Sequence, residues 1–449
     1  MKQIVLASTL FGIMTATAAI DEGKLGDGYS ERILITSKHS VAPEASAPLL
    51  ESAAAAALLT RFDRVLSLNE MLEPQHPARW KVPQINVASY ERLLRRYWDL
   101  GEEEVDLVLE SVHVSPAATM AEIFWNSKIF VLSEGLMSYG PTREPQSPAF
   151  GHRMQALVYL DLVEGLTPLL LAEHGVPTVA VSPAGFRTVV EDMGRSYGPV
   201  PIEPGAEPTA LVLGQYLAAL GLMSAEEEVA MQVAMLERAQ EAGAHRVIFK
   251  PHPTAPPADI DAIRMSAEQR GVDLVILRDP VPAEVLLAKL DIMLVVASFS
   301  TALVTAQRVF EIPIASVGAD TVLEALKPYQ NSNRIPATVV RALTRDDNHT
   351  RTGASLQGLI TAVAYCMQPK TLTQGRSTAV SVLSKIDLTE RREYFKRRRL
   401  GKLGLPGGTR PSRTHEVAVA VATRLPAAWR ENAYFGSQSA LRRVPRFGR

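Results

Sequence analysis

Short apolar runs alternate with helical stretches along most of the first 370 residues of this 449-residue chain. Each run has the length of a buried strand, and each intervening stretch has room for a helix, which is the pattern of parallel βα units. Because such units build open sheets with helices on both faces, the alternation predicts an α/β fold with doubly wound parallel sheets.

The expected strands fall into two series on either side of residues 183–208, which collect Pro, Gly and polar residues and form the expected linker. The first series comprises Ile4–Ala7, Arg32–Thr36, Arg64–Leu68, Leu107–Glu110, Ile129–Leu132, Ala156–Leu160 and Thr178–Val181. The second comprises Ala210–Leu213, Arg246–Lys250, Asp273–Leu277, Ile292–Val296 and Ile314–Val317. Within the second series we expect an amphipathic helix from about Ser224, which supplies its N-cap.

This division predicts two Rossmann-like domains at residues 1–195 and 205–370, followed by a crossing helix and a basic tail at 371–449. Open α/β sheets bind ligands at the carboxyl ends of their strands, so two such sheets in one chain place the ligand in a cleft between them. The apolar fraction of 47% is enough for two ordinary cores and excludes a disordered chain.

The single cysteine, Cys366, cannot form an intrachain disulfide or a cysteine-rich zinc site. A reducing compartment is therefore compatible, and we expect a cytoplasmic protein. No stretch of the sequence reaches the roughly 18 uninterrupted apolar residues that a membrane-spanning helix needs.

The N-terminus carries two competing signals. Met1-Lys2 followed by an apolar run to Ile20 resembles a secretory leader, with small residues at Ala16–Ala19 for cleavage. The alternative is a buried strand at Ile4–Ala7, a polar turn, and a helix at Leu10–Ile20. The basic n-region has only one Lys and hydroxyl residues interrupt the apolar run, so we favour the strand, turn and helix.

The near-neutral total charge of −1 hides a strong asymmetry. From Arg391 to Arg449 there are 15 Lys and Arg against three Glu, a net of +12, which leaves −13 for residues 1–390. The tail also contains aromatic residues, as nucleic-acid-binding segments do. We expect it instead at the anionic inner face of a membrane, and we expect no nucleic-acid partner.

Polar residues follow two expected strands of the second series. His252 stands between two prolines directly after Val247-Ile248-Phe249, and the prolines hold the imidazole rigidly at the sheet edge. Such a histidine can donate a hydrogen bond or a proton to a leaving phosphate, although an ordinary loop histidine has the same surroundings in sequence. Ser298, Ser300 and Thr301 follow the expected strand Ile292–Val296, where hydroxyls either cap a helix or hold an anion.

Two carboxylates complete the candidate set. Glu284 opens a helix after a Pro-rich turn, where it either favours the helix N-terminus or accepts hydrogen bonds from ribose hydroxyls. Glu134, followed by Gly135, ends a buried strand of the first series. Partial desolvation there raises the pKa of a carboxyl group and makes it usable as a general base, whereas an exposed loop carboxylate is the plain alternative.

Several common motifs are missing from the sequence. It contains no Gly-x-x-x-x-Gly-Lys phosphate loop, no Gly-x-Gly-x-x-Gly fingerprint, and no His/Cys cluster with zinc spacing. These absences argue against hydride transfer to a nicotinamide cofactor and against metal-assisted chemistry.

Taken in order, four segments resemble the motifs of bacterial sialyltransferases. They are Ser133-Glu134-Gly135, Lys250-Pro251-His252-Pro253, Pro282-Ala283-Glu284 and Ser298-Phe299-Ser300-Thr301. The chain resembles the α-2,8-polysialyltransferase-like family, whose members have the two-domain glycosyltransferase-B fold. The resemblance covers about residues 1–370 and begins at Val5–Leu10, which argues against a cleaved leader.

The resemblance implies roles for individual residues. Glu134 would be the base that deprotonates the acceptor hydroxyl, with Ser8, Thr9 and Gly135 on the acceptor side; Ser133 stands where the family has a first acid. His252-Pro253 and the hydroxyls of Ser298, Ser300 and Thr301 would hold the phosphate of the CMP-sugar. Glu284 would bind the ribose, and Gly214-Gln215 would lie beside the cytosine. The family uses no metal and no cofactor.

We therefore expect an inverting glycosyltransferase that moves sialic acid, or a related nonulosonic acid such as Kdo, from a CMP-sugar to a glycan acceptor of a surface polysaccharide. Three alternatives stay open. They are a CDP-polyol phosphotransferase of wall-polymer synthesis, a sugar-nucleotide epimerase of the same fold, and a non-catalytic binding protein.

Overall fold

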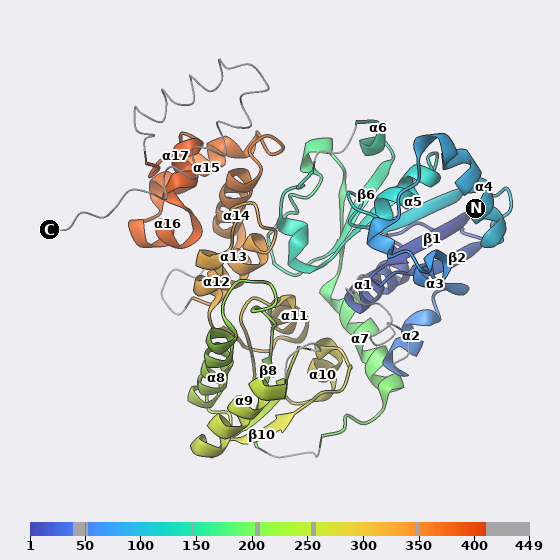
Figure 1. The fold of residues 1–449 in the computed structure, drawn as a ribbon. Coiled ribbons are helices and arrows are strands. Elements are labelled where there is room, and N and C mark those ends of the chain that lie inside the picture. The colour runs from blue at the N-terminus through green and yellow to red at the C-terminus, as the bar shows by residue number, and fades with distance from the viewer. Residues whose placement is uncertain are drawn as a thin grey trace. The chain divides into compact units, whose positions relative to one another are not determined.

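The computed structural model describes residues 1–38, 50, 53–144, 148–202, 207–252, 257–345 and 351–409. The chain forms two compact units, Met1–Val382 and Leu383–Arg449. The first unit contains both β-sheets (Figure 1). In the described part of the chain, no helix has both the length and the apolar character needed to cross a membrane.

The first sheet has seven parallel strands in the order β3-β2-β1-β4-β5-β6-β7. The strands are β1 (Lys2–Ala7), β2 (Glu31–Thr36), β3 (Arg64–Ser67), β4 (Val105–Glu110), β5 (Ile129–Ser133), β6 (Met154–Leu160) and β7 (Thr178–Val181). All seven strands expected in the first half of the chain are present. β1 is central because Ile4 pairs with Ile33 of β2 on one side and with Leu107 of β4 on the other.

Helices and short 3₁₀ turns connect these strands. The helices are α1 (Leu10–Asp21), α2 (Ala56–Leu59), α3 (Leu68–Leu72), α4 (Val87–Tyr97), α5 (Ala117–Ile123), α6 (Pro148–Gly151) and α7 (Pro183–Tyr197). The 3₁₀ turns are η2 (Ala53–Ala55), η3 (Pro77–Arg79), η4 (Gln84–Asn86), η5 (Gly135–Tyr139) and η6 (Ala172–His174). The strand, polar turn and helix expected at the N-terminus correspond to β1, Ser8-Thr9 and α1.

The core of the first half is buried between β-strands and the helices α4 and α5. The rings of Trp98 and Phe124 stack there with centroids 6.3 Å apart, and both side chains are buried. Ile4, Ile33 and Leu107 of the central strands belong to the same cluster.

The second sheet has five parallel strands in the order β10-β9-β8-β11-β12. They are β8 (Thr209–Leu213), β9 (Arg246–Lys250), β10 (Asp273–Ile276), β11 (Leu294–Ala297) and β12 (Ile314–Ser316), as expected from the sequence. Helices α8 (Ala225–Glu241), α9 (Pro257–Arg270), α10 (Ala283–Lys289) and α11 (Thr301–Phe310) connect them. The N-cap expected at Ser224 is present and forms a capping box with Glu227.

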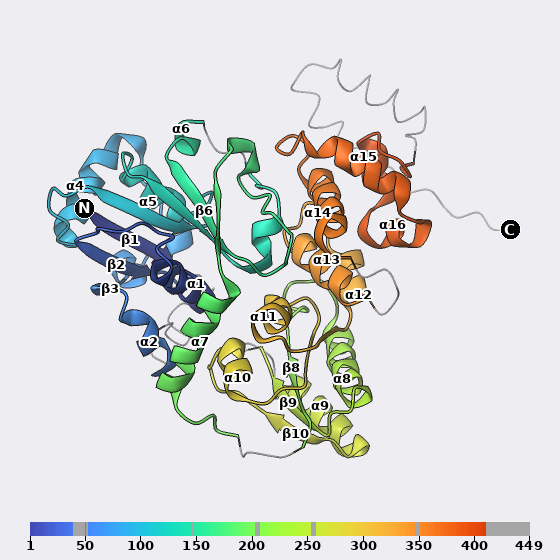
Figure 2. The same ribbon diagram turned by 180° about the vertical axis from the view of Figure 1, so that it is seen from behind.

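Three helices then return the chain to the first half of the unit. They are α12 (Ala319–Ala325), α13 (Arg334–Leu343) and α14 (Gly353–Met367). α13 contacts η5, and the side-chain oxygen of Gln357 accepts the N–H of Thr167 at 2.7 Å. The carboxyl ends of both sheets border one cleft, so the predicted glycosyltransferase-B architecture of two doubly wound sheets is confirmed (Figure 2).

The linker predicted for residues 183–208 is wrong over its first part, because α7 occupies residues 183–197. Pro183 stands at the first turn, where its missing N–H removes no helical hydrogen bond, and the Ser182 hydroxyl accepts the N–H of Gly185 at 2.9 Å. The buried side chains Phe186, Val189, Val190 and Met193 follow helical spacing. α7 packs against α1 of the first half and against α10 and α11 of the second.

The C-terminal region is more ordered than its composition suggests. Helix α15 (Gly375–Lys385) is followed by α16 (Leu388–Tyr394) and α17 (Arg397–Lys402), so the regular pattern does not end at Thr389. Tyr394, Phe395 and Leu400 are almost completely buried. In this stretch, basic residues are interspersed with buried apolar residues, and the composition alone does not show this order. Residues 410–449 of the predicted tail lie outside the described residues.

Candidate functional site

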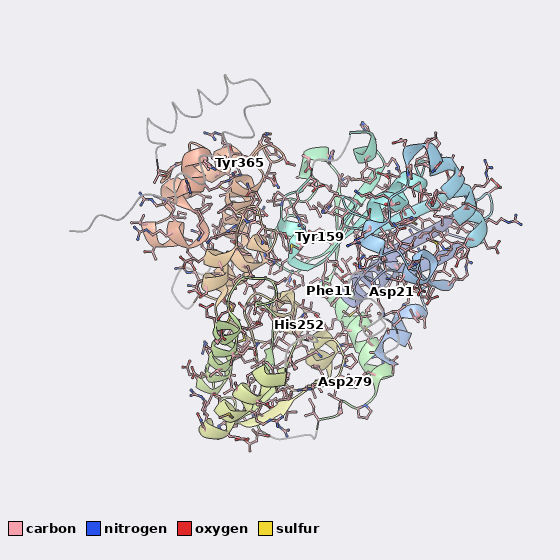
Figure 3. All side chains as sticks on the ribbon, viewed as in Figure 1. Phe11, Asp21, Tyr159, His252, Asp279 and Tyr365 are labelled. Atoms are coloured by element: carbon pink, nitrogen blue, oxygen red, sulfur yellow. The ribbon has the colours of Figure 1, made fainter. Side chains whose placement is uncertain are left out.

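A cleft of about 430 Å³ lies where the carboxyl ends of the two sheets approach each other. From the first half it is lined by Thr9, Phe11, Glu134, Gly135 and Met137. From the second half it is lined by Leu213, Gly214, Lys250, Pro251, His252, Ala283, Glu284, Ser300, Thr301 and Ala302. Phe11 and His252 mark its two sides in Figure 3. Most of the predicted site residues are therefore brought together.

The turn between β1 and α1 holds Glu134. Thr9 is the N-cap of α1, and its hydroxyl accepts the N–H of Gly12 at 2.9 Å. The same hydroxyl donates a hydrogen bond to Oε1 of Glu134. Burial raises the pKa of Glu134 above its ordinary value, whereas the hydrogen bonds from Thr9 and from the backbone of Gly12 act in the opposite direction.

A second carboxyl group, Glu110, lies beside Glu134 and was not among the predicted site residues. Oε2 of Glu110 accepts two hydrogen bonds from Ser8, one from the backbone N–H at 2.9 Å and one from the side-chain hydroxyl at 2.6 Å. Ser8 therefore holds Glu110 and does not line the cleft itself. Burial and the neighbouring Glu134 charge raise the pKa of Glu110 to about 8. The signal in the sequence was a carboxylate as the last residue of an apolar strand, next to the strand that ends before Glu134.

His252 projects from the end of β9 with its ring centroid 6.2 Å from that of Tyr216. Partial burial lowers the pKa of His252, and the charge of Glu228 opposes this change. The imidazole is therefore neutral at physiological pH and retains one N–H to donate. Pro253 lies outside the described residues.

Glu284 stands in the first turn of α10 and is 8% exposed. Burial raises the pKa of Glu284, and the nearby Lys250 cation lowers it. Lys250 donates a hydrogen bond to the carbonyl of Asp279 at 2.7 Å, and burial lowers the pKa of its ammonium group. Lys250 is a second functional candidate of this edge that the predicted set omitted.

The hydroxyl residues after β11 have separate positions. Ser300 is the N-cap of α11, accepts the N–H of Ala302 at 3.3 Å and lines the cleft together with Thr301. Ser298 is completely buried and does not line the cleft, so its side chain is not placed to hold a ligand there. Ser298 directly follows β11, whose residues are all buried, whereas Ser300 lies at the start of α11.

The two residues predicted beside a nucleobase also differ. Gly214 lines the cleft at the end of β8, where an added Cβ would lie 3.2 Å from Cα of Pro251. Oε1 of Gln215 accepts the N–H groups of Ser298 and Phe299 at 3.0 and 2.9 Å. The Gln215 side chain thus braces the turn after β11 instead of lining the cleft.

Metal-ligating residues were not expected, and the described residues contain no group of three or more His, Cys, Asp and Glu arranged to hold an ion. One Asp-x-Asp sequence exists, at Asp259 and Asp261, and it lies within helix α9.

The family model described as alpha-2,8-polysialyltransferase (POLYST) matches residues 3–319 of the chain. The chain belongs to the alpha-2,8-polysialyltransferase family. The matched region contains the residues that line the cleft and, apart from Lys2, the strands of both sheets. No curated protein sequence matches the chain.

Solved structures with similar folds are distant. A sialyltransferase from Photobacterium damsela is 12% identical, with 76% of this chain and 78% of that chain covered and a TM-score of 0.40. MurG from Acinetobacter baumannii is 10% identical over 84% and 94% of the two chains, with a TM-score of 0.40. A UDP-GlcNAc 2-epimerase from Neisseria meningitidis is 11% identical over 85% and 100%, with a TM-score of 0.42.

In this member of the polysialyltransferase family, the residue before Glu134 is Ser133. Ser133 is 4% exposed and lines a smaller cavity of about 120 Å³ that adjoins Glu134. Glu110 of the neighbouring strand β4 supplies the second carboxyl group beside Glu134 in this chain.

Proposed function

We propose that this protein is an inverting glycosyltransferase that transfers sialic acid, or a related nonulosonic acid, from a CMP-sugar to a glycan acceptor. The observation that carries the proposal is the placement of Glu134 and His252 on opposite sides of one cleft, each at the carboxyl end of a parallel strand. Family membership supports a sialyl-type glycosyltransferase. The proposed acceptor belongs to a surface polysaccharide.

Glu134 is the proposed general base. Its carboxylate is desolvated, held by Thr9 and exposed to the cleft, so it can accept a proton from an acceptor hydroxyl. In the reaction, the acceptor oxygen forms a bond to the anomeric carbon, its proton passes to Glu134, and the bond from that carbon to the phosphate oxygen breaks. Attack from the face opposite the leaving CMP inverts the anomeric configuration.

The second half is the proposed donor site. The N–H of His252 and the hydroxyls of Ser300 and Thr301 would donate hydrogen bonds to the phosphate as its negative charge develops. Glu284 would accept hydrogen bonds from the ribose, and Gly214 leaves room for the cytosine. We propose that these protein donors act without a metal or a cofactor, and chelator treatment should leave transfer unchanged.

Turnover of CMP-sialic acid by the purified protein tests this assignment. Glu134→Ala and His252→Ala should each lower transfer by about 10²-fold or more, because each removes a group used in the transition state. Glu268→Ala, an exposed carboxylate change on α9, is the matched control and should leave transfer unchanged. Undiminished transfer in either site variant removes that residue from the mechanism.

Calorimetry with CMP, CDP and UDP separates this proposal from its alternatives. We expect CMP to bind. Preference for CDP, with phosphorus in the polymer product, would indicate a polyol phosphotransferase, and consumption of a UDP-sugar without an acceptor would indicate an epimerase. Failure of all three nucleotides to bind would favour a non-catalytic protein.

We further propose a cytoplasmic enzyme held at the inner membrane face by its basic tail. The net charge of +12 from Arg391 to Arg449 supports this location, because anionic lipids attract clustered Lys and Arg.

A further inference from the structure

Two carboxyl groups converge on the first turn of α1. Ser8 holds Glu110 and Thr9 holds Glu134, although Ser8 and Glu110 are 102 residues apart in the sequence. A Cβ on Gly12 would lie 1.9 Å from Oε1 of Glu110 and 2.7 Å from Oε1 of Glu134. Glu110 and Glu134 therefore occupy the same small space, at the positive end of the helix dipole.

Among the described residues, the groups that surround Glu110 are hydroxyls and a second carboxyl group, and none is a compensating cation. On its far side is a cavity of about 70 Å³ lined by Ser8, Ser37, Ser111 and Ser115, and the charged group that acts on Glu110 is Glu134. Two carboxylates this close cannot both ionise easily, so one of them retains a proton near neutral pH. Oε2 of Glu110 already accepts two hydrogen bonds from Ser8, which leaves Oε1 to carry that proton toward Glu134.

We infer that Glu110 is a positioning residue that keeps its proton and donates it in a hydrogen bond to Glu134. Glu134 then remains the ionised carboxylate that faces the cleft and receives the acceptor's proton, whereas Glu110 exchanges no proton with the substrate. This role rests on the proposed function of Glu134.

The variants Glu110→Gln and Glu110→Ala test this role. The Gln amide still donates a hydrogen bond to Glu134, so its rate should stay within about threefold of the unmodified enzyme. The Ala variant loses this hydrogen-bond donor, so the pKa of Glu134 should rise by about one unit. The acidic limb of the pH profile of kcat should then move to higher pH by about one unit. At pH values on that limb, kcat should be about tenfold lower than in the unmodified enzyme. KM for the donor should not change. Glu102→Gln, an exposed acid before β4, is the control.

Equal losses in the Gln and Ala variants, or an Ala variant with an unmoved pH profile, would overturn the inference. A second measurement needs no activity. The folded protein keeps the Glu110 proton up to about pH 8, whereas the unfolded chain releases it near pH 4.5, so Glu110 makes the unfolding free energy fall as pH rises between these values. Urea unfolding at several pH values measures this dependence, and the unfolding free energy of Glu110→Gln should fall less steeply with pH than that of the unmodified protein. The same pH dependence in both proteins would contradict retention of the proton, even if no transfer activity is detected.

A different part of the molecule carries a second inference. The outer side of η4 and α4 exposes Ile85, Leu93 and Tyr97, which are 90%, 62% and 67% accessible. The opposite side of the helix buries Leu94, followed by buried Trp98, against the core. Leu93 and Tyr97 are four residues apart on α4 and so share one side of the helix, and Ile85 lies in the 3₁₀ turn that precedes it.

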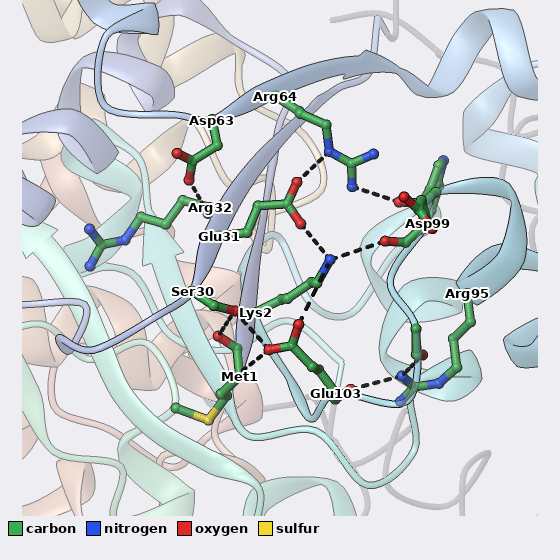
Figure 4. Close-up of polar contacts among 12 residues, drawn as sticks. Met1, Lys2, Ser30, Glu31, Arg32, Asp63, Arg64, Arg95, Asp99 and Glu103 are labelled. Carbon is green, nitrogen blue, oxygen red and sulfur yellow. Dashed lines mark hydrogen bonds and ion pairs between the residues drawn. The ribbon is translucent and has the colours of Figure 1, made fainter.

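Basic residues accompany this apolar stripe. Residues 81–97 contain four Lys and Arg against one acid, a net of +3. That acid, Glu91, is paired with Arg95 at 2.9 Å, and Arg95 also donates to the carbonyl of Glu103, as Figure 4 shows. Arg92 and Arg96 are exposed.

An exposed tryptophan adjoins the same helix. Trp125 is 61% accessible and follows Phe124, whose ring lies against Trp98 and 5.9 Å from the guanidinium carbon of Arg95. Aromatic and aliphatic side chains mixed with exposed cations match the boundary of an anionic bilayer, where the rings enter the headgroup region and the arginines meet lipid phosphates.

We propose that the surface formed by Lys81, Ile85, Arg92, Leu93, Arg96, Tyr97 and Trp125 docks onto an anionic lipid membrane. Its charge supports this occupant over a second copy of the chain, because facing cations would repel each other in a symmetric dimer. The surface belongs to the folded first unit and is independent of the basic tail.

Vesicle flotation of the full-length protein tests the docking surface. Binding should be strong to vesicles of phosphatidylcholine with phosphatidylglycerol and weak to phosphatidylcholine alone. Arg92→Glu with Arg96→Glu should weaken binding by at least 25-fold, about fivefold for each arginine removed. Ile85→Ser with Leu93→Ser should also weaken it. Leu220→Ser with Met265→Ser, equally exposed apolar positions elsewhere, is the matched control.

Unchanged vesicle binding in the arginine or apolar variants would overturn the proposal, as would an equal loss in the control. Analytical sedimentation in the same buffer tests whether a second copy of the chain occupies this surface instead. A dimer of the unmodified protein that the apolar variant converts to monomer would assign the surface to a second copy of the chain instead.

Discussion

Gly135 of the first half and Thr301 of the second half lie against each other at the site. Gly135 has φ of +50°, and a Cβ there would lie 2.9 Å from both Cγ2 and Oγ1 of Thr301. The glycine after the proposed base is therefore required both by its backbone conformation and by the side chain that opens α11 in the second half.

The first prediction concerns this contact. Gly135→Ala should lower the unfolding free energy by about 1–2 kcal/mol through the positive φ alone and should lower transfer by displacing Thr301. Adding Thr301→Ser removes the Cγ2 clash, so the double variant should regain part of the lost activity. Chemical denaturation and transfer rates measure both effects, and a strictly additive double variant would contradict direct contact.

Gly12→Ala is the second prediction. An alanine normally stabilises a helix by about 1 kcal/mol relative to glycine, but here its Cβ would meet the carboxyl groups of Glu110 and Glu134. We expect kcat to fall by more than tenfold while the fold is retained. Gly358→Ala in α14, where the added Cβ meets only Val382 at 3.3 Å, should keep full activity. Normal kcat in the Gly12 variant would show that the carboxyl positions do not matter.

Glu284→Gln is the third prediction. The substitution keeps the shape of the side chain but removes a buried negative charge beside Lys250. Hydrogen bonds to charged groups contribute about 1.5–3 kcal/mol, so the Kd for CMP measured by calorimetry should rise by about 10-fold to 100-fold. Glu268→Gln on the exposed side of α9 should bind CMP normally. An unchanged Kd for Glu284→Gln would remove this residue from the nucleotide site.

The last prediction concerns the basic tail. Removing residues 410–449 deletes a net charge of +6 but keeps α16 and α17, whose buried Tyr394 and Leu400 make a cut at Thr389 unsuitable. The shortened protein should move from the membrane fraction toward the soluble fraction of a cell lysate. If it fractionates like the full chain, the tail is not the tether.

Local sequence determined the strands and most of their ends. A run such as Val247-Ile248-Phe249 can be buried on both faces of a parallel sheet only, and the polar residue that follows must stand at the carboxyl edge. For this reason Glu134, His252, Glu284, Ser300 and Thr301 are recognisable from their positions in the sequence, and each lines the cleft. The failure at 183–197 has an equally local cause, since Pro183 and Gly185 suit the start of a helix as well as a linker.

Tertiary structure decided which of these residues act together. The order β1-β4-β5 brings Ser8 to Glu110 and Thr9 to Glu134, pairs separated by 102 and 125 residues, and no local pattern encodes that order. The same applies to Ser298, which is completely buried, and to Gln215, whose side-chain oxygen accepts the N–H groups of Ser298 and Phe299. Hydrophobic pattern is a property of neighbours along the chain, whereas the desolvation and charge coupling of two carboxyl groups depend on strand pairing and burial.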